Sequence, residues 1–215
     1  MSEFKTEQES FWAGEFGDDY IDRNQGNKLV AVDTALFAQI LFRANQPVES
    51  VIEFGANIGL NLRAIHKLLP EAELSGIEIN SKAVEKLGVI DKVKVYASSI
   101  LDFVLDYQRD FVLIKGVLIH INPDMLPVVY NLLHATSKRY ICIVEYYNPT
   151  PVEVPYRGHA GKLFKRDFAG EMLDQFDDLR LVDYGFVYHR DSKFPQDDLN
   201  WFLLERLNNE SCFSL

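Results

Sequence analysis

The chain is poor in cysteine, in long hydrophobic runs and in positive charge. Only two of its 215 residues are cysteines, which excludes a disulfide framework and is typical of a protein in the reducing cytoplasm. No window of about 18 apolar residues exists, so we expect no membrane-spanning helix. Lysine and arginine number 22 against 32 aspartates and glutamates, and the net charge of −10 disfavours binding to nucleic acid or anionic lipid.

The composition is that of an ordinary globular protein. Hydrophobic residues make up 47% of the chain and aromatic residues 13%, which excludes a disordered chain. The length indicates one domain over residues 1–215, and nothing in the sequence indicates an oligomeric state. Within this domain we expect three parts: an N-terminal helical segment or lid (1–46), a cofactor-binding core (47–145), and a substrate loop with a C-terminal helix and hairpin (146–215).

Short apolar runs alternate with amphipathic stretches through the core. The apolar runs predict strands at 51–54, 74–78, 93–96, 111–114 and 139–145. The amphipathic stretches predict helices at 27–44, 59–69, 81–87 and 123–135. Strands separated by helices of this length form βαβ units, so we expect an α/β fold with a mostly parallel sheet and helices on both faces.

The two ends of the chain break this rhythm. Residues 1–26 contain aromatic side chains between three glycines and predict one short helix followed by an ordered loop. After residue 145 we expect a long loop, a helix and two successive strands, over 146–166, 167–176, 179–188 and 200–207. Two strands without a helix between them predict a hairpin, with one antiparallel strand at the edge of the sheet.

A glycine-containing turn follows the first predicted strand. Gly55 and Gly59 lie between that strand and a helix, where a ligand can approach the backbone and the free N–H groups of the helix. Glu78 ends the second strand, 23 residues after Gly55, and a carboxylate there can accept hydrogen bonds from both hydroxyls of a ribose. A charge exposed to solvent at the strand end is the alternative for Glu78 taken alone.

The spacing of this turn disfavours a dinucleotide. The G-x-G-x-x-G pattern is absent, because Asn57 stands between the two glycines and residue 60 is leucine. Glu53, two residues before Gly55, is a poor neighbour for a pyrophosphate but a good one for a zwitterionic amino-acid tail. The pattern resembles motif I of the class I S-adenosylmethionine-dependent methyltransferases. Asn57 replaces its middle glycine, and asparagine tolerates left-handed backbone angles well enough for the turn to form.

This resemblance implies a Rossmann-like fold with a seven-stranded sheet, S-adenosylmethionine as cofactor and S-adenosylhomocysteine as product. It implies that Ser99 contacts the exocyclic amine of the adenine and Ile100 packs on its ring, with Ser98 or Asp102 as alternatives for the polar role. The remaining residues that we expect to bind the cofactor come from the N-terminal lid and from the ends of the core strands: Trp12, Tyr20, Arg23, Glu53, Gly55, Asn57, Gly59, Glu78, Ile79 and Lys115.

Three further stretches resemble a narrower family, the pseudaminic acid biosynthesis-associated methylases. They run from Phe11 to Asn24, from Gly116 to Pro123, and from Glu145 to Pro149 with a continuation at Tyr156 to His159. The resemblance implies a small anionic acceptor, a nonulosonic (sialic-like) sugar or its nucleotide-linked form. Alternatives are an amine or another small molecule, a protein-bound glycan, and a pathway partner that binds the cofactor without catalysis.

A hydroxyl acceptor needs a group that removes its proton. His120, just after the fourth strand, is the first candidate for this base, and Glu145 and His159 are the others. The alternative for His120 is a histidine that caps or packs the next helix. The five histidines are scattered without carboxylate or thiol partners at ligand spacing, so we expect no metal site.

The loop after the fifth strand is basic within an acidic protein. Arg157, Lys162 and Arg166 are candidates to bind an anionic substrate, and Tyr146 and Tyr156 are candidates to stack on its ring. The alternative is a loop whose charges are simply exposed to solvent.

Overall fold

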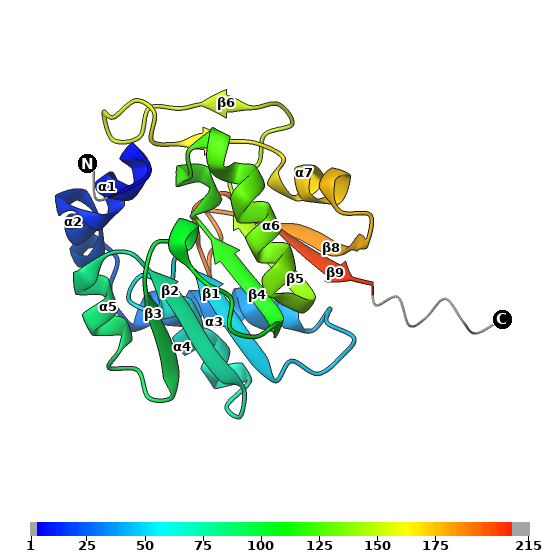
Figure 1. Cartoon of the computed structure of the whole chain (residues 1–215). Helices are drawn as coiled ribbons and strands as arrows, with labels where there is room; N and C mark the ends of the chain where they lie inside the picture. The colour runs from blue at the N-terminus through cyan, green and yellow to red at the C-terminus, as the bar shows by residue number, and fades with distance from the viewer. Residues whose placement is uncertain (1–3, 208–215) are drawn as a thin grey trace.

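The computed structural model describes residues 4–207, and a twisted β-sheet forms its centre (Figure 1). Its seven strands are β1 (Ser50–Phe54), β2 (Glu73–Glu78), β3 (Val93–Ala97), β4 (Arg109–Lys115), β5 (Ser137–Glu145), β8 (Leu179–Val187) and β9 (Leu199–Arg206). They are ordered β3-β2-β1-β4-β5-β9-β8. β1 to β5 are parallel, whereas β9 pairs antiparallel with both β5 and β8.

The predicted fold class is confirmed. The sheet is mostly parallel, and the hairpin of β8 and β9 supplies its one antiparallel strand at the β5 end. β9 is next to the edge and β8 forms the edge itself. Strand order reverses between β1 and β4, and in open α/β sheets such a point is where ligands bind, at the carboxyl ends of the strands.

Helices cover both faces of the sheet. α3 (Asn27–Leu41), α4 (Leu60–Leu68) and the end of α5 (Ser81–Leu87) pack on one face, and α6 (Leu126–Thr136) and α7 (Phe168–Gln175) pack on the other. Successive residues of a central strand alternate between the two cores, as strand geometry requires: Phe111 and Leu113 face α3, and Val112 and Ile114 face α6. The continuous apolar runs of the sequence therefore reflect burial on both sides.

The N-terminal segment differs from the prediction of one helix and a loop. It forms two helices, α1 (Glu7–Ala13) and α2 (Glu15–Arg23). Gly17, which suggested a loop, lies inside α2, at a point where a Cβ would stand 1.9 Å from the backbone oxygen of Trp12. Its role is to let the two helices pack closely.

The loop at 146–166 also contains structure that the sequence did not predict. A two-stranded ribbon, β6 (Val152–Glu153) with β7 (Phe164–Lys165), lies on the same side of the sheet as α1 (Figure 1). Both lie where the carboxyl ends of the parallel strands point. Among residues 4–207, no helix is long and apolar enough to cross a membrane.

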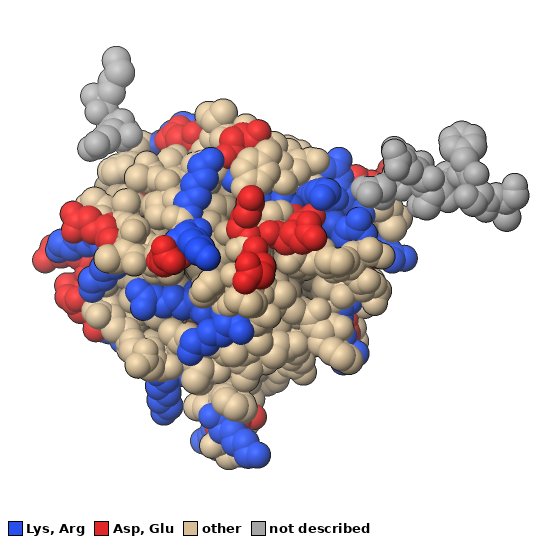
Figure 2. Space-filling view, turned by 90° about the horizontal axis from the view of Figure 1, so that it is seen from below, with Lys and Arg blue, Asp and Glu red and all other residues tan. Residues whose placement is uncertain are grey.

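Figure 2 shows the molecule from below, the side away from α1 and β6 in Figure 1. Lysine and arginine side chains there lie beside aspartate and glutamate side chains. The negative net charge is therefore not gathered into one acidic surface on this side.

Candidate active site

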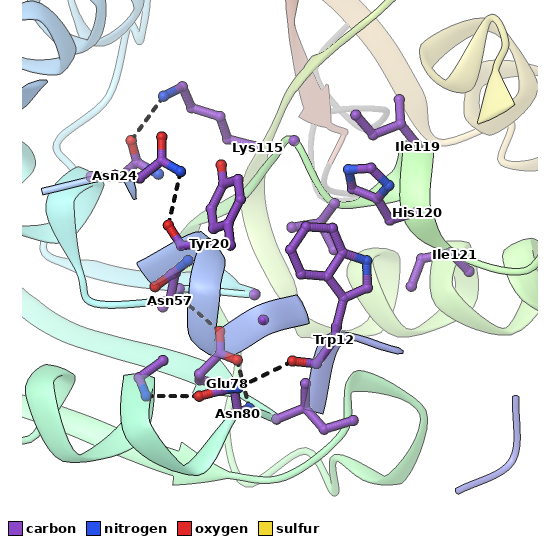
Figure 3. A pocket seen from close by; sticks show the side chains of 18 of the residues that line it. Trp12, Tyr20, Asn24, Asn57, Glu78, Asn80, Lys115, Ile119, His120 and Ile121 are labelled. Atoms are coloured by element: carbon purple, nitrogen blue, oxygen red, sulfur yellow. Dashed lines mark hydrogen bonds between the residues drawn. The ribbon is translucent and has the colours of Figure 1, made fainter. Parts of the chain in front are cut away.

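A cavity of about 540 Å³ lies at the carboxyl ends of the parallel strands, where the strand order reverses. α1 and α2 contribute Trp12 and Tyr20 to its wall (Figure 3). The cavity brings together most of the residues that the sequence singled out: Trp12, Tyr20, Gly55, Asn57, Glu78, Ile79, Ser99, Ile100, Lys115, His120, Tyr146, Tyr156 and Arg157.

The turn after β1 has the left-handed backbone that its residues predict. The angle φ is +75° at Gly55, +47° at Asn57 and +77° at Gly59. Asn57 therefore adopts the conformation expected of it. A Cβ at Gly55 would lie 2.6 Å from Val117 Cγ2, and one at Gly59 would lie 2.4 Å from Ile90 Cδ1, so a side chain at either position would displace these neighbours.

Glu78 is buried beside this turn, with both carboxylate oxygens hydrogen-bonded (Figure 3). Oε2 accepts the backbone N–H of Asn57 and Oε1 accepts that of Asn80, each at 2.7 Å. Burial raises the pKa of Glu78, and the backbone N–H groups partly oppose this shift. Each oxygen keeps a further lone pair, so the carboxylate can also accept hydrogen bonds from ligand hydroxyls.

A chain of polar side chains runs along the α3–α4 side of the cavity. Asn61 Nδ2 donates to Glu53 Oε1 at 2.5 Å, and Lys115 Nζ donates to Asn61 Oδ1 at 3.2 Å and to Asp33 Oδ1 at 2.8 Å. Glu53 lies behind the cavity wall, and its Oε2 is buried without a partner among the described residues. Burial raises the pKa of Glu53 to about 8, although Asn61 and Lys115 oppose the shift.

Several polar residues of the cavity were missed from the sequence: Glu9, Asp33, Asn61 and Asn80. Asn61 directly follows the glycine turn in α4, and Asp33 is a buried carboxylate in an otherwise apolar stretch of α3, so both carried a readable signal. Asn80 caps α5, and its Nδ2 donates to the backbone oxygen of Trp12 at 3.2 Å. That contact depends on how α1 packs, which no local pattern reveals.

His120 faces the cavity with a defined tautomer. Its Nδ1 lies 2.5 Å from the backbone oxygen of Lys162, which can only accept, so Nδ1 carries the proton. No described residue hydrogen-bonds to Nε2, which therefore keeps its lone pair. Burial lowers the pKa of His120 to about 4, and the ring is neutral at neutral pH. Its ring centroid lies 4.7 Å from that of Trp12 and 4.8 Å from that of Tyr156.

The structure does not bring the other two candidate bases to the cavity. Glu145 is buried beneath the turn that carries His120, where its Oε1 accepts the N–H groups of Val117 and Leu118, each at 2.8 Å. Burial raises the pKa of Glu145 to about 8 against these two hydrogen bonds. His159 is exposed and packs on the outer side of α1, with its ring centroid 5.1 Å from that of Phe11.

Arg23 also lies outside the cavity. It is at the end of α2, with its guanidinium 5.4 Å from the ring centre of Phe16 and 3.9 Å from Asp19. The sequence placed it in a binding loop, but the α2 helix turns its side chain outward. Asn24, the next residue, lines the cavity instead, and its Nδ2 donates to the backbone oxygen of Tyr20 at 2.9 Å.

The basic loop is only partly directed at the cavity. Arg157 lines it, whereas Lys162 pairs with Glu7 at 3.3 Å and Arg166 pairs with Glu171 at 2.7 Å. Carboxylates of α1 and α7 thus neutralise two of the three predicted anion-binding side chains. Glu7 is distant in sequence and Glu171 belongs to the next helix, so neither pairing could be seen in the sequence. The charge pattern alone therefore suggested a larger basic surface than the fold forms.

Part of the cavity wall is aromatic. Tyr20, Tyr146 and Tyr156 line it together with Trp12, and burial raises the pKa of Tyr20 and Tyr146 to about 12. Their phenols therefore stay protonated and can donate hydrogen bonds to an acceptor. Among residues 4–207, no group of three or more histidine, cysteine, aspartate or glutamate side chains is arranged to hold a metal ion.

No protein-family model matches the chain, and no curated protein matches its sequence. Solved structures do match its fold. The 1,6-didemethyltoxoflavin-N1-methyltransferase of Burkholderia thailandensis is 15% identical with a TM-score of 0.66, over 93% of this chain and 87% of that one. The magnesium protoporphyrin IX methyltransferase of Synechocystis, with bound S-adenosylmethionine, is 13% identical with a TM-score of 0.64, over 95% and 100%.

The plantazolicin methyltransferase in complex with S-adenosylhomocysteine is similar to the same extent, with 15% identity and a TM-score of 0.64 over 94% of both chains. At identities this low, the likeness establishes the fold. The chain has the Rossmann-like fold of the class I methyltransferases.

Proposed function

We propose that this protein is a methyltransferase that uses S-adenosylmethionine and releases S-adenosylhomocysteine. The observation that carries the proposal is the left-handed turn of Gly55, Asn57 and Gly59 with Glu78 beside it, at the strand ends of a cavity in a sheet of this topology. The left-handed backbone that Asn57 adopts in this turn supports the proposal. The dinucleotide alternative remains disfavoured by the spacing of the glycines.

The residues present fit this cofactor. Glu78 can accept the two ribose hydroxyls, and Ile79 and Ile100 offer apolar surface to the adenine. Lys115 and Asp33 place an ammonium and a carboxylate side by side, which matches the opposite charges of an amino-acid tail. Asn57 lines the cavity too, and its buried Oδ1 is an acceptor without a partner among the described residues.

Methyl transfer requires an acceptor atom aligned with the sulfonium methyl group that the cofactor supplies. His120 is the base in this proposal. Its Nε2 lone pair takes the proton from a hydroxyl acceptor, and the Lys162 carbonyl holds the ring in the required tautomer. Because the pKa of His120 is lowered to about 4, the base stays unprotonated and ready throughout the neutral range.

For the acceptor we propose a small anionic molecule of the nonulosonic sugar class. Arg157 at the cavity and the sequence resemblance support an anion, whereas Lys162 and Arg166 are occupied by carboxylates. The aromatic wall favours a second class, a planar uncharged small molecule that stacks on Trp12 or Tyr156. The two classes differ in their need for Arg157.

Mass spectrometry of acceptors incubated with methyl-deuterated S-adenosylmethionine tests both points. We expect transfer to nonulosonic acids, with Arg157→Ala raising KM roughly tenfold for them but not for phenolic acceptors. Arg63→Ala, an exposed change on α4, is the matched control.

His120→Gln should lower kcat about 100-fold, and the acidic limb of the wild-type pH profile should lie near pH 4. Methyl transfer to phenolic acceptors alone would reject a nonulosonic sugar as the acceptor. Full activity of His120→Gln would reject His120 as the general base.

A further inference from the structure

One carboxylate of the cavity comes from α1 and has no place in the account so far. Glu9 is buried, lines the cavity and contacts the loop that follows β3. We propose that Glu9 is the group that recognises the adenine ring, by accepting a hydrogen bond from its exocyclic amine. This inference rests on the proposed function, because it assumes that S-adenosylmethionine occupies the cavity.

The Glu9 carboxylate is held rigidly. Glu9 occupies the third position of α1 in a capping box, where its Oε2 accepts from Thr6 N at 2.8 Å and from Thr6 Oγ1 at 3.1 Å. Its Oε1 accepts a short hydrogen bond from the hydroxyl of Ser99. A carboxylate oxygen accepts two hydrogen bonds, so Oε1 retains a lone pair for a ligand donor.

The loop after β3 offers no carboxylate of its own to the cavity. Asp102 points outward, with its side chain 56% exposed, and pairs with Lys5 at 2.5 Å. Ser99 donates its hydroxyl proton to Glu9 and accepts a hydrogen bond from the N–H of Leu101 at 3.0 Å. Ser99 therefore orients Glu9, and the charged acceptor at this end of the cavity belongs to the N-terminal helix.

The other carboxylates that line the cavity have different surroundings. Asp33 pairs with Lys115, Glu78 holds the glycine turn, and Asp197 comes from the segment that precedes β9. Among these side chains, only the Glu9 carboxylate hydrogen-bonds to the loop after β3. Next to it, the Oε1 of Gln8 is buried at the cavity without a partner among the described residues, which adds a second acceptor to the same wall.

Contacts between α1 and the core place Glu9 relative to the ribose site. Asn80 donates to the backbone oxygen of Trp12 in α1, and the neighbouring Glu78 carboxylate accepts the Asn80 N–H. Gln8 Nε2 donates to the backbone oxygen of Gly161 at 2.8 Å and secures the other side of α1. In this proposal α1, which carries Glu9, is thus linked through Asn80 to Glu78, which binds the ribose.

The chemistry of a carboxylate gives the proposal its test. A 6-amino purine presents donors to Glu9, whereas a 6-oxo purine presents an acceptor, which leaves a buried charged oxygen facing another oxygen. We expect the wild-type protein to bind S-adenosylhomocysteine at least 30-fold more tightly than S-inosylhomocysteine, which shares its ribose and tail.

The experiment compares these two compounds by calorimetry on three variants. Glu9→Gln keeps the capping box, since glutamine also serves at that position, and its amide can donate to a 6-oxo group. The preference should fall to within about threefold, mainly through gained affinity for S-inosylhomocysteine. Asp102→Asn, the matched control outside the cavity, should keep the full preference. Ser99→Ala should lower the preference only in part, because Glu9 remains.

Each contrary result has a distinct meaning. An unchanged preference in folded Glu9→Gln overturns the assignment, and so does loss of the preference in Asp102→Asn. If Ser99→Ala abolishes the preference for S-adenosylhomocysteine and Glu9→Gln keeps it, Ser99 recognises the adenine instead of Glu9. Equal binding of both compounds by the wild type rejects adenine recognition by Glu9 but still supports binding of the cofactor. Binding of neither compound rejects the proposed function together with this inference.

Discussion

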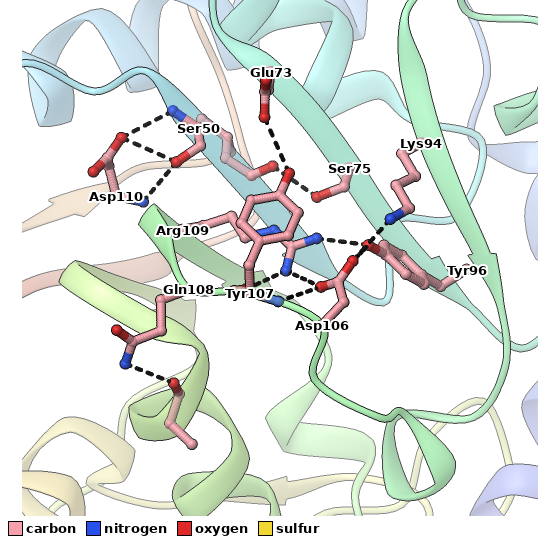
Figure 4. A network of polar contacts seen from close by, with 12 residues as sticks. Ser50, Glu73, Ser75, Lys94, Tyr96, Asp106, Tyr107, Gln108, Arg109 and Asp110 are labelled. Carbon is pink, nitrogen blue, oxygen red and sulfur yellow. Dashed lines mark hydrogen bonds and ion pairs between the residues drawn. The ribbon is translucent and has the colours of Figure 1, made fainter.

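Two clusters of polar groups lie at opposite ends of the parallel strands and are built differently. Around the start of β4, Arg109 is fully buried and donates to Asp106, to the backbone oxygen of Tyr107 and to Tyr96 (Figure 4). The ring of Tyr107 lies 3.6 Å from its guanidinium, and Lys94 pairs with Asp106 at 2.8 Å. Only Arg109 Nε lacks a partner in this cluster, which we call the Arg109 network.

At the carboxyl ends of the strands, several acceptors are left unpaired instead. Glu53 Oε2, Asn57 Oδ1 and Glu145 Oε2 are buried without partners among the described residues. Unpaired buried oxygens destabilise the fold, so they persist where another function requires them. The Arg109 network stabilises the chain, whereas at the other end, within residues 4–207, Asn57 Oδ1 is an unpaired acceptor of the cavity wall and the Oε2 atoms of Glu53 and Glu145 lie unpaired behind that wall.

The pKa shifts of the two clusters have opposite signs. Burial raises the pKa of Asp106, but hydrogen bonds from Arg109, Lys94 and Tyr96 outweigh it and leave the pKa well below its usual range. Burial raises the pKa of Glu53 and of Glu145 to about 8, and their partners do not compensate. The network is thus built for charged groups, and the interior beside the cavity is built for neutral ones.

The largest effect on stability should come from breaking the Arg109 network. Arg109→Leu should lower the free energy of unfolding by about 3 kcal/mol, because it leaves Tyr96 and Asp106 without their buried partner. Urea unfolding at neutral pH measures this. Lys94→Met, which removes the exposed partner of Asp106, should cost less than about 1 kcal/mol. Equal losses in the two variants would contradict the account.

The next effect is a dependence of stability on pH, which should have one sign for Glu53 and Glu145 and the opposite sign for Asp106. Between pH 4.5 and pH 8 the folded state keeps protons on Glu53 and Glu145 that the unfolded chain releases, so stability should fall as pH rises through this window. Glu53→Gln and Glu145→Gln should each flatten this fall, by on the order of 2 kcal/mol at pH 8. Urea unfolding of the ligand-free protein across the window measures the slope.

Asp106→Asn is the counterpart from the other cluster. The stability contributed by Asp106 is present above pH 3.8 and is lost as pH falls through its lowered pKa, so this variant should be destabilised at neutral pH. A wild-type slope in both glutamine variants would show that the two carboxyl groups titrate normally.

The comparison also shows what could be predicted from the sequence. The alternation of strands and helices, the left-handed turn at Asn57 and the position of Glu78 follow from local pattern, and the structure contains them. Arg23 was misread because α2 continues through it and turns its side chain outward, and Gly17 was misread because the packing of α1 against α2 requires it. That packing is a tertiary contact without a local signature.

Charge patterns were the least informative part of the sequence. Lys162 and Arg166 form a run of basic residues with Arg157, yet each pairs with a carboxylate from a helix. Glu9 shows the converse: it reads as an ordinary helix-start residue, and only the fold turns it toward Ser99.

The smallest effect should come from the turn after β1. Asn57→Gly should change stability by no more than about 0.5 kcal/mol, because glycine adopts the same left-handed angle but gains freedom in the unfolded chain. Asn57→Ala should cost about 1–2 kcal/mol, because alanine tolerates that angle poorly. Thermal unfolding of the pair measures the difference. Equal stabilities would mean that the turn does not need a left-handed residue at this position.

The central claim is that the cavity binds S-adenosylmethionine through Glu78. Calorimetric titration with S-adenosylhomocysteine, with NAD alongside, tests it most directly. We predict binding of S-adenosylhomocysteine but not of NAD, weakened by roughly 30-fold or more in a folded Glu78→Ala variant that loses the carboxylate beside the glycine turn. Binding of NAD alone, or binding of S-adenosylhomocysteine that Glu78→Ala leaves unchanged, would contradict the account.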